Sequence, residues 1–588
     1  MDRRQFTKRI LAGSIAGSIA GSIAGSVASR FTPAAVWAEP LRAPTAKVAR
    51  SRHAVAATVH PLATQAAMDA YARGGNAVDA AVAASLMLSV VDIHNSGLGG
   101  GGLALIRTPS GEVFALDGRE RAPLAATPAT FMRGGAPDPS LSQTGPLAAG
   151  TPGLPALLER MSQRFAAASW TSSLTGAAEV AARGFPIDAP LARNFASNAT
   201  TLRKFPESAR VLLDSSLQPL AVGQTFIQPD LARTLQQLSE HGSKWFYQGE
   251  FAQRADKLMR ATGGVLAVRD FEQYFVAERE PIECEYRKQR IIGFPPPSSG
   301  GLHMAQMLTM LSRFDVRSLF ESSEAQGLHL LAEVMKRAMA DRAHWLGDAD
   351  YAPVPRGLLD AKYLSERGRD IDLSRSTEVT GHGLPANFDE DLFAPGKHTT
   401  HLTTADDHGF VVALTQTVNT SFGSKMVVPG TGVLLNNEMD DFSLAPGVRN
   451  AFGLVGSAAN AVAPGKRPLS SMSPTIVLDA DGNFRMSCGA AGGPKIITSV
   501  LQTLVRSIDL GQPIDVALSS PRIHHQWSPD KLAYEETLPE AVSQALQQMG
   551  HELERGKTLA VAQGVQRQAD GQLVAASDPR VPSCAAGA

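Results

Sequence analysis

Cysteine, net charge and long apolar runs are all scarce in this chain of 588 residues. Its three cysteines (Cys284, Cys488 and Cys584) are too few for a disulfide framework, and their spacing fits no zinc site. The 55 basic and 56 acidic residues give a formal net charge of -1, whereas a nucleic-acid binder should show a basic excess. Beyond the N-terminal segment, no apolar run reaches the length of about 18 residues that a spanning helix needs. Because 44% of the residues are hydrophobic, a globular protein with a large core remains.

Residues 1–38 have the pattern of an export signal and not of a folded segment. Arg3 and Arg4, followed by a Gln-Phe-Thr-Lys string, are typical of a twin-arginine signal. A weakly hydrophobic Gly-Ser-Ile-Ala repeat spans 13–24, and residues 36–38 suit signal peptidase. An uncleaved membrane anchor is the alternative, but the repeat is short and rich in glycine for a spanning helix. We therefore expect a mature chain that is soluble, periplasmic and without a membrane segment.

The pattern of predicted elements changes along the chain. End signals predict two early helices, 61–73 and 77–91, the second capped by Asn76. Residues 377–398 are polar and aperiodic, as expected of an exposed linker that can be cut. Helices, then hairpins, then helices indicate sheets covered by helices on both sides. The other predicted elements are strands within 103–107, 113–117, 402–417 and 475–487, and helices at 325–346, 496–510 and 539–549.

A glycine-rich stretch resembles a dinucleotide-binding motif. Gly97, Gly99 and Gly102 satisfy the pattern GxGxxG, and Asp117 lies downstream. A nucleotide site needs a strand before the glycines and a helix after them. Here a predicted helix precedes them and a predicted strand follows. We therefore expect a close-packed glycine turn and no nucleotide site.

The segment His398-Thr399-Thr400-His401 lies where the polar linker meets a predicted hairpin. A cut before Thr399 would place a hydroxyl and a new α-amine on one residue. The pKa of such an amine is about 7.7–8.0, so one residue could supply both nucleophile and base near neutral pH. Taken alone, a threonine pair at the start of a strand is ordinary, because strands favour threonine.

A series of strings in a fixed order supports the chemical interpretation. They are GGNAVDAA (74–81), SGLGGG (96–101), DGRE (117–120), PPPSSGG (295–301), TTH (399–401), TVNT (417–420), LLNNEMDDF (434–442), KRPLSSMSP (466–474) and PRIHHQW (521–527). In these strings the chain closely resembles the γ-glutamyltransferase family of N-terminal-nucleophile hydrolases, also called γ-glutamyl transpeptidases. The resemblance runs from about residue 60 to about residue 580.

The resemblance implies an α+β fold, a four-layer αββα sandwich of the N-terminal-nucleophile hydrolase type. It implies a precursor that cuts itself between His398 and Thr399, giving a large part of about 360 residues (39–398) and a small catalytic part of about 190 (399–588). Thr399 would then attack the γ-carbonyl of a donor such as glutathione. Water, an amino acid or a peptide would accept the γ-glutamyl group. Neither a metal nor an organic cofactor is implied.

The resemblance also assigns roles in substrate binding. Arg119 would hold the α-carboxylate, a task suited to a planar guanidinium, and Ser470 and Ser471 would donate to the same group. Glu438 and Asp441 would face the α-ammonium from the opposite side of the pocket.

The remaining assigned residues concern the reacting atoms. Thr417 would hydrogen-bond the nucleophile, and Asn419 would contact the substrate. Gly492 and Gly493 would offer bare backbone N–H groups to the oxyanion. Taken one at a time, all of the assigned positions have ordinary alternatives, such as a surface ion pair, a solvated acidic turn, a routine strand residue or a plain turn.

Some features leave the specificity open. Ala490-Ala491 stand where the family commonly has Ser-Pro before the glycine pair, and Phe452 stands where several bacterial relatives have a lid tyrosine. His524-His525 suggests a metal site, but adjacent strand residues point to opposite faces, so we expect structural histidines.

Two other functions remain as alternatives. One is an acylase of the same fold acting on another amide, such as a glutaryl side chain, and the other is a catalytically silent periplasmic protein that binds γ-glutamyl compounds.

Overall fold

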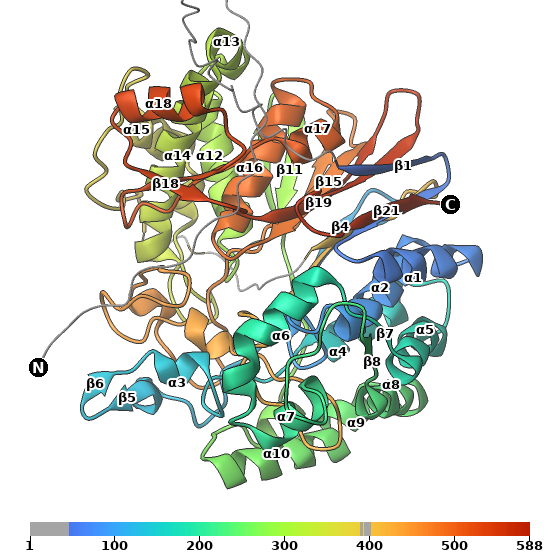
Figure 1. The fold of residues 1–588 in the computed structure, drawn as a ribbon. Coiled ribbons are helices and arrows are strands. Elements are labelled where there is room, and N and C mark those ends of the chain that lie inside the picture. The colour runs from blue at the N-terminus through green and yellow to red at the C-terminus, as the bar shows by residue number, and fades with distance from the viewer. Residues whose placement is uncertain (1–45, 389–391, 393–400) are drawn as a thin grey trace, which may run out of the picture. The chain divides into compact units, whose positions relative to one another are not determined.

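The computed structural model describes residues 46–388, 392 and 401–588 (Figure 1). All of them belong to one compact unit, Arg42–Ala588. The predicted export signal lies outside the described residues, as does the predicted cleavage pair, His398 and Thr399. Within the described part of the chain, no helix is both long and apolar enough to cross a bilayer.

Two seven-stranded sheets form the centre of the unit, and all of their strand pairs are antiparallel. The sheets pack face to face, with β13 against β15, β12 against β19 and β2 against β20. In order, the first sheet is β1 (Lys47–Ser51), β20 (Leu573–Ser577), β19 (Val561–Arg567), β15 (Phe484–Ala491), β14 (Thr475–Leu478), β11 (Gln289–Gly293) and β10 (Ile282–Tyr286). The second is β21 (Cys584–Gly587), β2 (Ala54–Thr58), β12 (Leu402–Asp406), β13 (Val411–Thr417), β3 (Gly101–Arg107), β4 (Val113–Gly118) and β9 (Ala277–Arg279).

Side chains of the second sheet alternate between two hydrophobic cores. On β13, Val411 and Ala413 belong to the core shared with the first sheet, whereas Val412 and Leu414 belong to the core under the helices. This alternation follows from the period of two in a strand. A strand buried on both faces therefore reads as an almost continuous apolar run.

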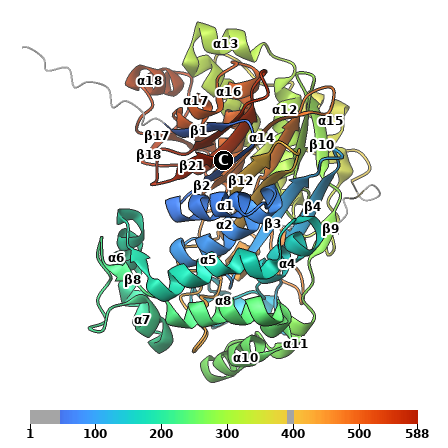
Figure 2. The ribbon, with the colours of Figure 1, turned by 90° about the vertical axis from the view of Figure 1, so that its right-hand side faces the viewer.

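Helices cover the outer face of each sheet. The second sheet carries α1 (Pro61–Ala72), α2 (Ala77–Val91) and α4 (Leu154–Phe165), and the first carries α12 (Gly300–Leu311), α16 (Lys495–Ile508) and α17 (Ile514–Ser519). The long helix α14 (Glu324–Trp345) packs on α12. Figure 2 shows α1 and α2 on one side of the strands and α12 and α16 on the other. The four-layer αββα prediction is confirmed.

Helix α2 begins where the sequence predicts. Asn76 accepts hydrogen bonds from the backbone N–H groups of Val78 and Asp79, and Asp79 accepts one from the N–H of Asn76. This capping box satisfies N–H groups that have no partner within the helix. All fifteen residues of α2 are buried, in agreement with its apolar sequence.

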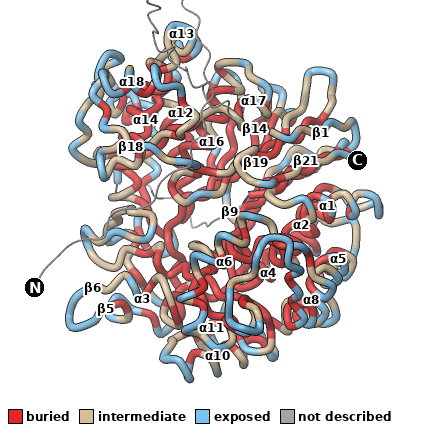
Figure 3. The backbone as a smooth tube through the Cα atoms, in the orientation of Figure 1, coloured by how far each residue is buried: buried red, intermediate tan, exposed pale blue. Residues whose placement is uncertain are grey.

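The region between β4 and β9 holds helices that local patterns do not predict. They surround the core that lies between the second sheet and its helices, and Figure 3 shows that their outer faces are exposed. Here and elsewhere the other elements are α3 (Ser140–Gln143), α5 (Trp170–Arg183), α6 (Ala189–Leu202), α7 (Pro206–Leu212), α8 (Pro229–His241), α9 (Lys244–Tyr247), α10 (Glu250–Thr262), α11 (Val268–Glu272), α13 (Val316–Ser322), α15 (Ala361–Arg367), α18 (Glu540–Gln548), β5 (Met132–Arg133), β6 (Ala136–Pro137), β7 (Phe185–Pro186), β8 (Thr225–Phe226), β16 (Ile523–His525), β17 (Leu532–Glu535) and β18 (Leu553–Gly556).

The glycine stretch joins α2 to β3, in the order helix, glycines, strand. A Cβ atom on Gly99 would lie 2.0 Å from the carbonyl oxygen of Leu434, and one on Gly100 would lie 1.7 Å from that of Thr417. The turn is therefore close-packed, as predicted. It lets the chain approach the end of β13, where Thr417 lies.

We expect Gly100→Ala to destabilise the protein by about 1–3 kcal/mol or more, because the new methyl group would overlap a backbone oxygen. Gly97→Ala is the matched control, since Gly97 is also buried but a Cβ atom there would meet nothing within 4 Å. The melting temperatures of the two variants should differ by about 1–3 °C, because a chain of this length shifts by roughly 1 °C per kcal/mol. Equal values would show that the close approach does not constrain the fold.

Candidate active site

A cavity of about 330 Å³ lies at the ends of β13 and β15. Every predicted site residue that the structure describes lines it, except Arg119. These residues come from distant parts of the sequence and meet because β13 packs against β15. They are Thr417, Asn419, Glu438, Asp441, Ser470, Ser471, Gly492 and Gly493.

The end of β13 fixes one edge of the cavity. The hydroxyl of Thr417 accepts a hydrogen bond of 2.7 Å from the backbone N–H of Asn419. Asn419 has a φ of 76°, in the left-handed region that asparagine tolerates better than most residues. Its side-chain amide donates to the carbonyl of Asn437, at 3.0 Å. This contact ties the strand end to the turn that carries Glu438.

Arg119 forms a buried ion cluster beneath the cavity. Its guanidinium pairs with Glu438, with Asp441 at 2.9 Å and with Glu120 at 3.3 Å. We expected Arg119 on the opposite side of the pocket from Glu438 and Asp441, and that arrangement is wrong. The fully buried guanidinium takes the carboxylates as its partners, and two of them, Glu438 and Asp441, line the cavity.

The cluster carries more acid than base. Burial raises the pKa of Glu438 well above its usual range, although Arg119 opposes the shift. Burial also raises the pKa of Glu120 to about 7 and that of Asp441 to about 6, again against the pull of Arg119. Glu438 Oε2 is buried and has no hydrogen-bond partner among the described residues. The cluster can therefore accept a cation with hydrogens to donate.

The glycine turn after β15 forms another wall. Gly492 has a φ of 143° and Gly493 a φ of 60°, and a Cβ on Gly493 would lie 2.6 Å from the ring of Phe452. Only glycine suits these positions, so two backbone N–H groups lie at the cavity without side chains of their own. Helix α16 begins just beyond, at Lys495, and its N-terminal end favours negative charge nearby. Phe452 packs directly on this turn.

Ser470 and Ser471 form a third wall, the serine wall, and it rests on a residue that sequence reasoning missed. Ser471 Oγ accepts a hydrogen bond of 3.0 Å from Nη2 of Arg342, which is buried in α14. No signal in the sequence singled out Arg342, because it is one of several charged residues in α14. Further polar residues of the cavity were missed as well, and no role was assigned to them: His60, Asp92, His94, Asn95 and Asp188.

The predicted pair His524 and His525 is buried and fully engaged. His524 hydrogen-bonds Thr498 and Gln526, and His525 pairs with Asp530 and accepts from the backbone of Trp527. Burial lowers the pKa of both imidazoles. These contacts agree with the structural interpretation.

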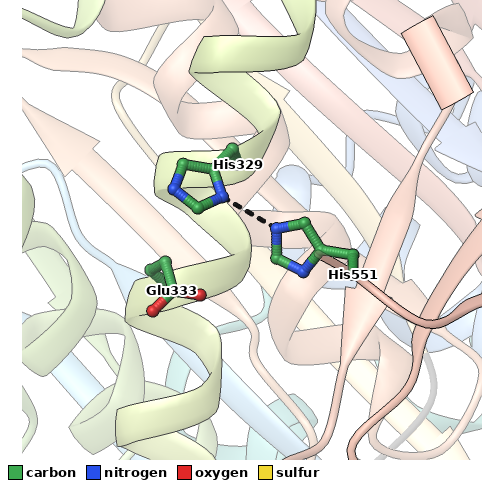
Figure 4. A group of neighbouring side chains, drawn as sticks. All are labelled: His329, Glu333 and His551. Carbon is green, nitrogen blue, oxygen red and sulfur yellow. Dashed lines mark hydrogen bonds between the residues drawn. The ribbon is translucent and has the colours of Figure 1, made fainter. Parts of the chain in front are cut away.

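One group among the described residues has the composition of a metal site: His329, Glu333 and His551, with ligand atoms within 4.8 Å of one another (Figure 4). The two histidines already share a hydrogen bond of 2.8 Å. Glu333 is paired with Lys336 at 2.7 Å and with Arg337 at 2.9 Å. Two cations on the only carboxylate of this group compete with a metal ion, so the residues do not fit one well.

Comparison with known proteins places the chain in a family. The model of the gamma-glutamyltranspeptidase family matches residues 63–588. The glutathione hydrolase proenzyme of Escherichia coli strain K12 is 38% identical over 536 residues, covering 90% of this chain and 91% of that protein. The proenzyme of Bacillus subtilis strain 168 is 36% identical and covers 84% of each chain.

Solved structures agree on the fold. A cephalosporin acylase from Bacillus halodurans matches with a TM-score of 0.81 at 25% identity, covering 95% of this chain and all of that one. The γ-glutamyltranspeptidase of Helicobacter pylori matches with a TM-score of 0.53 at 35% identity, covering 54% of this chain and 92% of that one. On the extent of the family match and the identity to its members, this chain belongs to the γ-glutamyltranspeptidase family.

Proposed function

We propose that the protein is a self-processing γ-glutamyl hydrolase and transferase that acts on glutathione-like donors. The observation that carries the proposal is the single cavity that combines Glu438 and Asp441, the serine pair and the glycine turn. A γ-glutamyl group has an ammonium, a carboxylate and a reactive carbonyl, and each needs a partner once water is removed. Relatives that match most of the chain are named glutathione hydrolase proenzymes.

In this proposal the acidic cluster binds the α-ammonium, with Glu438 Oε2 and Asp441 as acceptors. Ser470 and Ser471 donate to the α-carboxylate. Arg119 remains a donor-site residue through the carboxylates that it holds, and its buried Nε has no hydrogen-bond partner among the described residues. Asn419 contacts the substrate at the end of β13.

The reaction proceeds by acyl transfer. The hydroxyl oxygen of Thr399 attacks the γ-carbonyl carbon, and the α-amine of the same residue takes the hydroxyl proton. The backbone N–H groups of Gly492 and Gly493 stabilise the resulting oxyanion. When the C–N bond breaks, the leaving amine takes the proton and a γ-glutamyl ester of Thr399 remains. Water or an amine then attacks the ester and releases Thr399.

Maturation by a cut between His398 and Thr399 follows from the same proposal, giving parts 39–398 and 399–588. The pairing of β12 with β13 supports it, because Leu402 is the register partner of Leu414. From Leu414, β13 continues to Thr417, which lines the cavity, so the chain enters β12 from the cavity end of this hairpin.

The acylase alternative can be compared directly, since a cephalosporin acylase shares the fold. A glutaryl group has the carboxylate but lacks the α-ammonium. The unsatisfied acceptor on Glu438 and the negative excess around Arg119 therefore favour a γ-glutamyl over a glutaryl substrate.

We expect the purified protein to run as two bands on a denaturing gel, with the smaller band starting at Thr399. Thr399→Ala removes the hydroxyl and should give one uncut, inactive chain, whereas Thr399→Ser keeps a hydroxyl and should still be cut. N-terminal sequencing and hydrolysis of a γ-glutamyl anilide measure these outcomes. A different new terminus, or wild-type activity in Thr399→Ala, would contradict the proposal.

Binding of the donor's product, L-glutamate, should weaken as the pH falls from 7 to 5. The pKa of Asp441 is about 6, so its negative charge is lost in this range and its attraction for the ammonium is lost with it. The inhibition constant of L-glutamate should rise, approaching roughly tenfold per pH unit well below the pKa. In Asp441→Asn it should already be high at pH 7 and should change less with pH, because Glu120 is then the group of the cluster that still titrates in this range.

Glutarate is the matched ligand control, because it lacks the ammonium. Its inhibition constant should rise far less than that of L-glutamate between pH 7 and 6, where glutarate largely keeps both of its negative charges. If L-glutamate and glutarate behave alike, the acidic cluster does not bind an ammonium group, and the acylase alternative gains support.

Export through the twin-arginine signal is part of the proposed function. Replacing Arg3 and Arg4 together by lysine should leave the protein, with its signal still attached, in the cytoplasm of a host that has this pathway. Cell fractionation with an antibody against the protein measures the outcome. Periplasmic protein at wild-type amounts would show that residues 1–38 direct export in another way.

A further inference from the structure

Arg342 stands apart from the other deeply buried arginines of the described chain. Arg119, Arg337, Arg467 and Arg522 each form an ion pair with at least one carboxylate. Arg342 is only 4% exposed, and the described carboxylates form no ion pair with it. Its hydrogen bonds go to hydroxyl groups instead.

Both of those hydroxyls belong to the serine wall or to its support. Nη2 of Arg342 donates to Ser471 Oγ at 3.0 Å, and Nε donates to Ser299 Oγ at 3.0 Å. Ser299 in turn donates its hydroxyl to the carbonyl of Ser470, and its backbone N–H donates to the same carbonyl at 3.0 Å. One guanidinium thus fixes the hydroxyl of Ser471 directly and the backbone carbonyl of Ser470 through Ser299.

The direction of these bonds determines what the serines can do. A hydroxyl has one proton to donate and two lone pairs to accept with. Because Arg342 donates to Ser471 Oγ, the proton of that hydroxyl stays available for an acceptor in the cavity. If the buried partner of Ser471 were a hydrogen-bond acceptor, such as a carboxylate, it would take that proton and leave none for the substrate.

The charge of Arg342 is balanced by no bonded carboxylate among the described residues. Burial lowers the pKa of this guanidinium to about 10, which still leaves it protonated near neutral pH. Asp441 acts on it through space, but the carboxylate of Asp441 is hydrogen-bonded to Arg119. A buried cation without a counterion is costly, and an anion in the cavity would offset part of that cost.

We propose that Arg342 is the positioning residue of the α-carboxylate subsite, orienting the hydroxyl of Ser471, holding the backbone of Ser470 through Ser299 and supplying the positive charge behind both serines. The proposal rests on the proposed function and deepens it. It also explains part of the string 295–301, because Ser299 connects Arg342 to Ser470 through hydrogen bonds. The group that this subsite would bind is a carboxylate on a carbon that also bears an ammonium, as in an α-amino acid.

The test compares two substrates that differ only in the carboxylate: a γ-glutamyl anilide and a 4-aminobutyryl anilide. Arg342→Met keeps the length of the side chain but removes its charge and its donors. The KM for the γ-glutamyl anilide should rise on the order of tenfold or more, because the serine hydroxyl loses its charged donor and the carboxylate loses the positive charge behind it. The kcat should change less, and kcat/KM for the 4-aminobutyryl anilide should stay within about twofold.

Arg337→Met is the matched control on the same helix. Arg337 is buried too, but it pairs with Glu333 and Asp370 and bonds neither serine of the cavity. It should lower the melting temperature without raising the KM. Arg342→Lys keeps the charge but cannot bridge both serines, so its KM should lie between those of the wild type and Arg342→Met.

Folding and maturation of each variant are checked by melting temperature and by the two-band gel. If Arg342→Met does not mature, Ser299→Ala tests the same link and should raise the KM for the γ-glutamyl anilide alone. An unchanged KM in a matured variant, or equal losses on both substrates, would overturn the proposal for Arg342. A wild type without γ-glutamyl anilide hydrolysis would instead overturn the proposed function itself.

Discussion

The cavity depends on a buried imbalance of charge. Arg119 shares one positive charge among Glu120, Glu438 and Asp441, at a site largely closed to water. Carboxylates so close to one another repel, and burial prevents water from screening the repulsion. The guanidinium holds them together, and their raised pKa values show that the balance is incomplete. A cationic ligand completes it, which is why the cluster can serve recognition as well as structure.

Arg342 has the opposite deficit, a positive charge without a bonded carboxylate among the described residues. Asp441 lies within the electrostatic reach of both arginines, so the acidic and the basic regions adjoin. An amino acid carries its ammonium and its carboxylate on the same carbon. A site for it must therefore place a negative and a positive region side by side without letting them neutralise each other. Asp441 is bonded to Arg119, and Arg342 is bonded to hydroxyl groups, so the acidic and the basic regions do not pair with each other.

Local sequence patterns predicted the elements that frame this site but not its electrostatics. The cap at Asn76, the hairpin of β12 and β13 and the order of the glycine turn follow from short-range rules, and the structure has them. The helices between β4 and β9 were not predicted, because their buried faces depend on a distant core. Arg342 was missed for a related reason. Whether a buried arginine has a carboxylate beside it is decided by the fold and leaves no mark in the neighbouring residues.

The segment that precedes the predicted cut is held more firmly than an exposed linker would be. Glu333 accepts the hydroxyl of Thr377, and Lys336 donates to the carbonyl of the same residue at 2.9 Å. Further along, the indole of Trp527 donates to the carbonyl of Val379 and that of Trp345 to the carbonyl of Gly383. None of these hydrogen bonds depends on the peptide bond before Thr399, so they would still hold the segment after the chain is cut. Glu333, which does not fit a metal site, therefore has a structural reason to be buried with Lys336 on α14. Together with the two indoles, this pair fastens residues 377–383 to the body of the protein, so a cut further along the chain would leave this segment in place.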